Sequence, residues 1–230
     1  MFREKVDVCI LVSAGAEWRA LVPHYPHAIV ETTPYGECFR ACLAGQAVCF
    51  IRGGWGKVAA AGSTQYAIDR WLPDRLINLG TCGGFRGQVT RGDVILAHRT
   101  VIYDIYEQMS DPEAAIARYS VDLDLSWLPE PPPQPVMVGT MVSADRDLVP
   151  RDIPMLISKY GALVADWESG AIAWVAKRNN MPCMILRAVS DPVGDDGGEA
   201  DGNYAFFEEQ CVPIMANFAQ HLPAWLKAFD

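Results

Sequence analysis

Four charged side chains lie close together in the sequence, near the ends of two apolar runs. Asp166 and Glu168 follow one apolar run, and Arg187 and Asp191 lie in and just after the next one, 183–189. In an open α/β sheet, ligands bind outside the carboxyl ends of the strands. Two acidic sites at neighbouring strand ends therefore predict a site for a small molecule.

Each of these charged residues also has a plain structural explanation. Glu168 suits the start of a helix, Asp191 suits a loop cap, and Arg187 suits an ion-pair partner for it. Glu17 lies in the opening turn of a helix expected over 16–22, where the helix dipole favours a carboxylate. Taken singly, each structural explanation is at least as good as a chemical one.

A glycine-rich segment at 53–57 precedes an alanine-rich helix and is a candidate ligand loop. Backbone N–H groups at such a helix start can bind an anion. The segment does not match a P-loop, because Val58 stands where Ser or Thr should follow Gly-Lys, and its spacing is not that of a dinucleotide fingerprint. Glycines that simply allow a tight turn explain it equally well.

Apolar runs bounded by turn residues predict the remaining elements. Strands are expected over 6–13, 75–79 (ending in a glycine loop, 80–84), 93–97, 135–142 and 183–189, and 37–43 with 47–52 should form a hairpin. Helices are expected over 58–71, 153–160, 169–180 and 204–228, the last kinked or broken at Pro213 and Pro223. This order predicts an α/β protein: a single three-layer α/β/α domain over residues 1–230, with a mixed, largely parallel central sheet.

Two segments show no clear period. Residues 111–134 form an irregular, proline-rich connection, and a long loop of this kind is often a lid or a subunit contact, although a merely solvated loop is equally consistent. Residues 192–202 are acidic and rich in glycine, so we expect them to be mobile.

Composition excludes several classes of protein. With 230 residues, half of them hydrophobic, the chain can bury a large core. A net charge of -9 argues against a nucleic-acid partner. No apolar run is long enough to span a membrane, and the first residues do not match a signal peptide. The 7 cysteines lie mostly in apolar runs and lack zinc-ligand spacing, which favours reduced thiols in a cytoplasmic protein.

Four segments, taken in order, resemble the nucleoside phosphorylase/nucleosidase superfamily, and are most similar to its 5′-methylthioadenosine/S-adenosylhomocysteine nucleosidases. They are the first strand with Ala16-Glu17-Trp18, then GWGKVAAAG (54–62), INLGTCGGFRGQVTRGDVIL (77–96), and DWESGAIAWVA (166–176) followed by LRAVSD (186–191). Together they span nearly the whole chain, and their joint order is far more specific than any one of them.

The resemblance implies cleavage of a purine–ribose N-glycosidic bond without a metal or cofactor, in a homodimer whose ligand is a small nucleoside. Asp191, beside Ser190, would protonate or hydrogen-bond purine N7, and Glu168 would accept hydrogen bonds from the ribose hydroxyls. Glu17 would position the attacking water, with Arg187 and Thr81 as its neighbours. Substrate-binding positions carried by the same motifs are Gly83, Asp166 and Trp167.

The resemblance leaves the nucleophile and the activity open. The arginine that related phosphorylases carry before the second glycine loop is replaced by Asn78-Leu79, and Glu17 would repel phosphate, so we expect water. Arg19 is close enough in sequence to bind phosphate instead. A phosphorylase and a catalytically silent nucleoside-binding protein are therefore alternatives.

Three departures from the family pattern concern the substrate. Trp167 replaces a methionine beneath the ribose, and 146–148, Arg-Asp-Leu, occupy the position of an aromatic residue that stacks on the base. The segment after Val101 lacks the usual His-Asp pattern; its Tyr103, Tyr106 and Met109 would line a 5′ pocket from a neighbouring subunit. The reaction class is thus better defined than the substrate.

Overall fold

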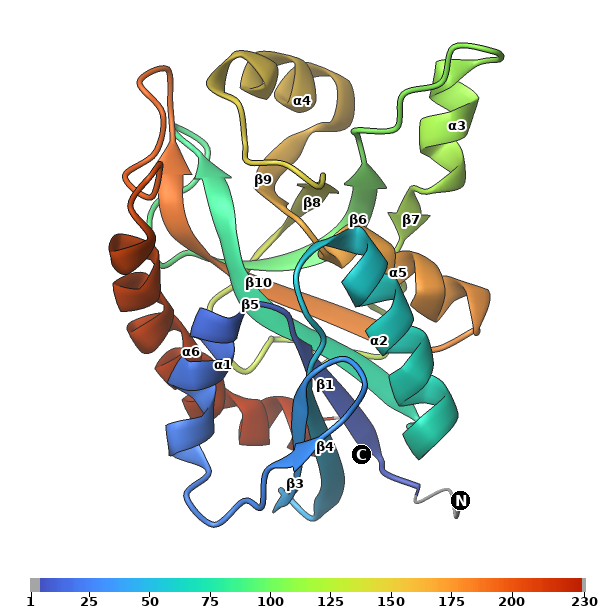
Figure 1. Cartoon of the computed structure of the whole chain (residues 1–230), viewed down its shortest axis with the longest axis vertical. Coiled ribbons are helices and arrows are strands. Elements are labelled where there is room, and N and C mark those ends of the chain that lie inside the picture. The colour runs from blue at the N-terminus through green and yellow to red at the C-terminus, as the bar shows by residue number, and fades with distance from the viewer. Residues whose placement is uncertain (1–4, 229–230) are drawn as a thin grey trace.

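The computed structural model describes residues 5–228 and contains a mixed sheet between two layers of helices (Figure 1). The strands are β1 (Val8–Val12), β2 (Glu31–Thr32), β3 (Glu37–Leu43), β4 (Gln46–Arg52), β5 (Arg75–Phe85), β6 (Val94–Ile102), β7 (Val121–Asp122), β8 (Met137–Ser143), β9 (Ala162–Asp166) and β10 (Cys183–Val193). The helices are α1 (Gly15–Leu21), α2 (Gly56–Trp71), α3 (Pro112–Arg118), α4 (Ile153–Tyr160), α5 (Ser169–Arg178) and α6 (Tyr204–Lys227), with short 3-10 turns at Val22–His24 and Pro150–Asp152.

The sheet has the order β10-β6-β8-β9-β5-β1-β4-β3-β2, and β10 also pairs with β5. That extra pairing closes β5, β10, β6, β8 and β9 into a ring, from which the other strands extend as an open sheet. The run β4-β1-β5-β10 is parallel, whereas β3 and β2 at the edge pair antiparallel. Strand β5 is therefore common to the ring and the open sheet, and its carboxyl end lies beside that of β10 (Figure 1).

Two helix pairs cover the two faces. Helices α1 and α6 lie together on one face and α2 and α5 on the other, as Figure 1 shows. Trp18 and Phe218 belong to the apolar cluster under the first pair, and Ile68 and Ile172 belong to the cluster under the second. The predicted α/β/α fold class is confirmed, and the sheet is mixed as expected.

The second glycine segment is part of a strand, so the loop expected at 80–84 was wrong. Strand β5 continues through it and pairs in parallel with β10 up to Phe85. A Cβ added at Gly80 would lie 2.6 Å from an Arg187 nitrogen, and one at Gly84 would lie 2.6 Å from Val189. These glycines serve close approach of side chains from the neighbouring strand rather than a turn.

The closing helix has nearly the expected length but is more regular than expected. Helix α6 runs unbroken past Pro213 and Pro223. Pro213 is exposed, so water can bind the carbonyl that loses its partner, while the buried stripe holds the helix in place.

The connection at 111–134 contains more structure than its sequence indicated. It includes the short helix α3, capped by Asp111, and the strand β7, which pairs with β6. In the described part of the chain, no helix is long and apolar enough to cross a membrane.

Candidate active site

A cavity of about 550 Å³ opens at the carboxyl ends of β5 and β10, beside the start of α6. All the residues that the sequence singled out as site residues line it: Glu17, Thr81, Gly83, Asp166, Trp167, Glu168, Arg187, Ser190 and Asp191. The structure therefore brings together residues from both halves of the chain.

Arg187 is the centre of the deep end of the cavity. Its guanidinium lies 3.1 Å from Asp166, 3.4 Å from Glu168 and 3.7 Å from Glu17, and the side chain is fully buried. Burial alone would lower the pKa of Arg187, but the three carboxylates outweigh it and raise that pKa. One permanent positive charge is thus shared among three buried acids.

Glu17 is held by donors on both of its oxygens. Oε1 accepts hydrogen bonds from the Thr81 backbone N–H at 2.6 Å and from the Thr81 hydroxyl at 2.8 Å. Oε2 accepts the Ala14 backbone N–H at 3.0 Å. The glycine at position 80 permits this, since a Cβ there would lie 2.7 Å from Glu17 Oε1. Glu17 therefore faces the cavity in a fixed orientation.

Glu168 is the N-cap residue of α5 and lies at the same end of the cavity, but its side chain points away from that helix start to other partners. Its Oε1 accepts the Gly56 backbone N–H at 3.1 Å, and its Oε2 accepts from Arg187 at 3.4 Å. Burial raises the pKa of Glu168 to about 8; Arg187 opposes this rise, while Asp166 and Glu17 add to it. The carboxyl group therefore changes charge close to neutral pH.

Asp166 makes contacts that orient the rest of this end. Its oxygens accept from the Ser143 hydroxyl at 2.5 Å, from the Ser169 hydroxyl, and from the Ser169 backbone N–H at 3.0 and 3.2 Å. With the Arg187 ion pair, these bonds occupy both oxygens, which favours a positioning role over direct contact with a ligand.

Asp191 lies at the other end of the cavity, inside β10 rather than after it. Its Oδ1 accepts the Glu199 backbone N–H at 2.9 Å and its Oδ2 accepts the Ala200 N–H at 3.0 Å. The neighbouring Ser190 hydroxyl donates to the Cys82 carbonyl at 3.3 Å. Asp191 thus fixes part of the segment 192–202 that we expected to be mobile.

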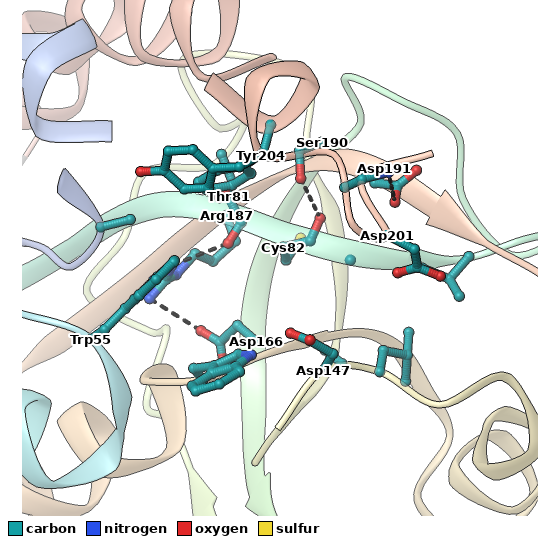
Figure 2. A pocket seen from close by; sticks show the side chains of 18 of the residues that line it. Trp55, Thr81, Cys82, Asp147, Asp166, Arg187, Ser190, Asp191, Asp201 and Tyr204 are labelled. Atoms are coloured by element: carbon teal, nitrogen blue, oxygen red, sulfur yellow. Dashed lines mark hydrogen bonds and ion pairs between the residues drawn. The ribbon is translucent and has the colours of Figure 1, made fainter. Parts of the chain in front are cut away.

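Four aromatic residues, Trp55, Trp167, Tyr204 and Phe207, line the cavity and are called the aromatic wall below. Trp55 and Tyr204 lie on the side opposite Asp191 and Asp201 (Figure 2). The Trp55 and Trp167 rings stack with centroids 6.1 Å apart, and Tyr204 meets Trp55 edge-on at 6.5 Å. The sequence analysis gave neither Phe207 nor Trp55 a role in the site. A tryptophan between two glycines at a strand-to-helix turn was the available signal.

The positions at which the sequence departs from the family pattern also line the cavity. Arg146, Asp147 and Leu148 all lie on its wall. Arg146 is held at 2.7 Å from Asp152 and lies over the Tyr103 ring. None of these three residues is aromatic, so this stretch presents an aliphatic and charged surface to the cavity.

Other predicted neighbours lie outside the cavity. Arg19, considered as a phosphate ligand, forms an exposed ion pair with Glu208 of α6. Tyr106 and Met109 are highly exposed and are not among the lining residues, and Tyr103 is buried beneath Arg146.

Comparison with known proteins agrees with this architecture. The family model described as the phosphorylase superfamily matches residues 7–224. The chain belongs to this superfamily. Its relatives include a 5'-methylthioadenosine/S-adenosylhomocysteine nucleosidase of Tolumonas auensis, 28% identical over 86% of this chain and 90% of that protein. A protein of the same name from Geobacillus sp. is 32% identical over 67% of this chain and 72% of that one.

Solved structures share the fold of this phosphorylase-superfamily chain. The 5'-methylthioadenosine/S-adenosyl homocysteine nucleosidase of Campylobacter jejuni superposes with a TM-score of 0.80 at 17% identity, covering 96% of this chain and 99% of that one. The nucleosidase of S. pneumoniae with a transition-state inhibitor gives a TM-score of 0.77 at 23% identity, covering 97% and 100%.

Proposed function

We propose that this member of the phosphorylase superfamily hydrolyses the N-glycosidic bond of a purine nucleoside and releases the base. The proposed substrates are of the 5′-methylthioadenosine/S-adenosylhomocysteine type, the activity named for its relatives. The observation that carries the proposal is the group of three buried carboxylates around Arg187 at the deep end of the cavity.

The deep end suits a sugar that gains positive charge as the bond to the base breaks. Glycosidic cleavage passes through an oxocarbenium-like transition state, which fixed carboxylates stabilise. Glu168 is the proposed acceptor of hydrogen bonds from the ribose hydroxyls. Each of its oxygens has one protein donor, and a carboxylate oxygen accepts more than one bond, which supports this role. This role requires the ionised form, so ribose binding should strengthen as pH rises through about 8.

Glu17 is the proposed ligand for the attacking water. Its donors are the Thr81 N–H, the Thr81 hydroxyl and the Ala14 N–H, so its orientation is set before substrate binds. A fixed carboxylate at a cavity wall can orient a water and accept its proton.

Asp191 is the proposed partner of the base. Both of its oxygens accept backbone N–H groups of the 199–200 turn, so one of these bonds must be exchanged before the carboxyl can donate to purine N7. In this proposal Asp191 enters the reaction carrying a proton, gives it to N7 as the bond between base and ribose breaks, and regains a proton from solvent before the next turnover.

Charge favours water over phosphate as the nucleophile. Arg146 and Arg187 are the arginines among the lining residues, and carboxylates engage both. The same surface carries six acids in all, Glu17, Asp147, Asp166, Glu168, Asp191 and Asp201. A dianion would meet a negative cavity without a free cation.

The test is chromatography of a panel of purine nucleosides incubated with the protein, with and without phosphate. Release of free base at equal rates in both buffers, with ribose rather than ribose 1-phosphate as co-product, is the expected result. Strict dependence on phosphate would establish the phosphorylase alternative. Tight binding with no turnover of any nucleoside would establish the silent binder, which the departures at Trp167 and 146–148 motivate.

We also propose that two copies pair through an apolar patch at the rim of the cavity, formed by Trp55, Val58, Tyr106 and Met109. Val58, Tyr106 and Met109 are each more than four-fifths exposed, at 87%, 82% and 95%. The ion pair between Lys57 and Asp104 brings the two segments together. Equilibrium sedimentation of the wild type and of Val58→Asp tests this pairing; a monomeric wild type would exclude it.

A cytoplasmic location remains part of the proposal. All 7 cysteines have free thiols, and most of them are buried. This is the expected state in a reducing compartment, where disulfides do not persist.

A further inference from the structure

Three charged side chains outside the cavity join the start of α2 to the ends of β6 and β8. The Lys57 ammonium pairs with Asp104 and lies 3.7 Å from Asp145. The Lys57 backbone N–H donates to Asp145 Oδ1 at 2.7 Å, and the Asp145 N–H donates to Asp104 Oδ2 at 2.9 Å. Both the side chain and the backbone of Lys57 are therefore fixed.

These contacts lie next to a bond that reaches the proposed ribose ligand. The first N–H groups of a helix have no partner within the helix. In α2, Gly56 donates its N–H to Glu168 and Lys57 donates its N–H to Asp145, so two acids from different strand ends cap the helix. Moving the α2 start by an ångström would break the Gly56 bond and shift the ring of Trp55, its N-cap residue.

The backbone of Gly56 lies close to Asp145. Gly56 has φ +82, and a Cβ there would lie 3.0 Å from Asp145 Oδ1. A residue with a side chain at position 56 would therefore be strained and would crowd Asp145. The Lys57 and Asp104 side chains are less than one-fifth exposed, at 19% and 17%, so solvent weakens this ion pair less than one on the open surface.

We propose that Lys57, Asp104 and Asp145 are positioning residues that hold the start of α2 against the cavity and thereby align Glu168 and Trp55. The effect on catalysis rests on the proposed nucleosidase reaction, whereas the effect on the position of the α2 start does not. None of the three contacts the reacting atoms, and they act through the Gly56 N–H.

Two variants with opposite charge changes separate positioning from a general electrostatic effect. Lys57→Met removes a positive charge, and Asp104→Asn removes a negative one with little change in shape. Through-space electrostatics would move the pKa of Glu168 up in the first and down in the second. Loss of the Gly56 N–H bond, which holds that pKa down, would move it up in both.

The charges that face Glu168 from other elements stay unchanged in both variants. They are Arg187 on β10, Asp166 on β9 and Glu17 on α1. The matched control is Lys159→Met, which removes a lysine paired with Glu113 at a more exposed site outside the cavity lining.

The first measurement is hydrogen exchange at residues 53–60, which needs no substrate. We expect faster exchange of the Gly56 and Lys57 amides in Lys57→Met and Asp104→Asn, and no change there in Lys159→Met. Unchanged exchange in both Lys57→Met and Asp104→Asn would overturn the proposal whether or not the protein is a nucleosidase. Thermal unfolding of each variant establishes that the comparison is made on folded protein.

The second measurement is the pH profile of kcat/KM for nucleoside hydrolysis. In both Lys57→Met and Asp104→Asn, we expect kcat/KM at neutral pH to fall roughly 10- to 100-fold, as for a misplaced reacting group. We also expect the acidic limb of the profile to move to higher pH in both variants. Opposite movements of that limb would show a charge effect alone and reject positioning. A wild type without turnover would count against the proposed function and leave the exchange result to decide the structural part.

Discussion

The two ends of the cavity differ in how firmly their acids are held. At the deep end, Glu17 and Glu168 are bound to Arg187 and to backbone N–H groups of regular elements. At the other end, Asp191 is bound to a turn in an irregular segment. Preorganised charges suit the part of a substrate on which charge develops, and adaptable segments suit the part that varies. The contrast supports our proposal that the sugar chemistry takes place at the deep end and that the turn recognises the base.

The largest expected effect comes from removing the charge that holds the deep end together. Arg187→Met leaves three buried carboxylates without their counterion, so the free energy of unfolding should fall by about 3–5 kcal/mol and hydrolysis should be lost. Urea denaturation measures the first effect. Arg99→Met, which removes an exposed partner of Asp122, is the control and should cost about 1 kcal/mol or less. An equal loss of unfolding free energy in the two variants would show that the carboxylates of the deep end do not depend on Arg187 as their counterion.

Asp191→Asn tests the other end. Loss of a general acid should lower kcat by roughly 100- to 10,000-fold, while the amide oxygen still accepts one of the two turn N–H groups. Steady-state kinetics in phosphate-free buffer measures this. Asp124→Asn removes a comparable cap on the Ser126 N–H away from the cavity and should leave kcat unchanged. A variant with normal kcat would reduce Asp191 to a loop cap.

The dependence of stability on pH should come from the deep end. An unfolded glutamate loses its proton near pH 4.3, whereas burial raises the pKa of Glu168 to about 8 in the folded chain. Between these values the folded state binds more protons, so the Glu168 contribution to stability is lost as pH rises from about 4 to about 8. The difference between wild type and Glu168→Gln in urea at pH 5 and pH 8 measures it. A difference that does not change with pH would contradict the raised pKa.

The smallest expected effect concerns the aromatic wall. Trp167→Met removes the ring stacked on Trp55 and restores the residue type usual in the family, so preference among 5′ substituents should change by several-fold, the order of one altered apolar contact. Competition between two nucleosides that differ only at the 5′ position measures the ratio. An unchanged ratio of the two nucleosides would show that the aromatic wall does not contribute to substrate selection.

Periodicity and motif order were sufficient for most of the elements and for the fold class, although α3 and β7 were missed. The helix 153–160 and the strand 37–43 have the bounds expected from their apolar patterns. Two of the misjudged segments share a cause. Glycines at 80–84 and prolines in α6 have local preferences against strand and helix, and burial of neighbouring side chains overrides those preferences.

The sequence by itself determined which residue types meet, because motif order identified Glu17, Glu168, Arg187 and Asp191 before any geometry was known. Only the tertiary structure decided how they are held. Because residue 80 is a glycine, the side chains of Glu17 and Arg187 can lie directly against strand β5. Burial of the carboxylates around Arg187 in this packing raises the pKa of Glu168. Distances and desolvation depend on neighbours far apart in the chain, which local patterns do not encode.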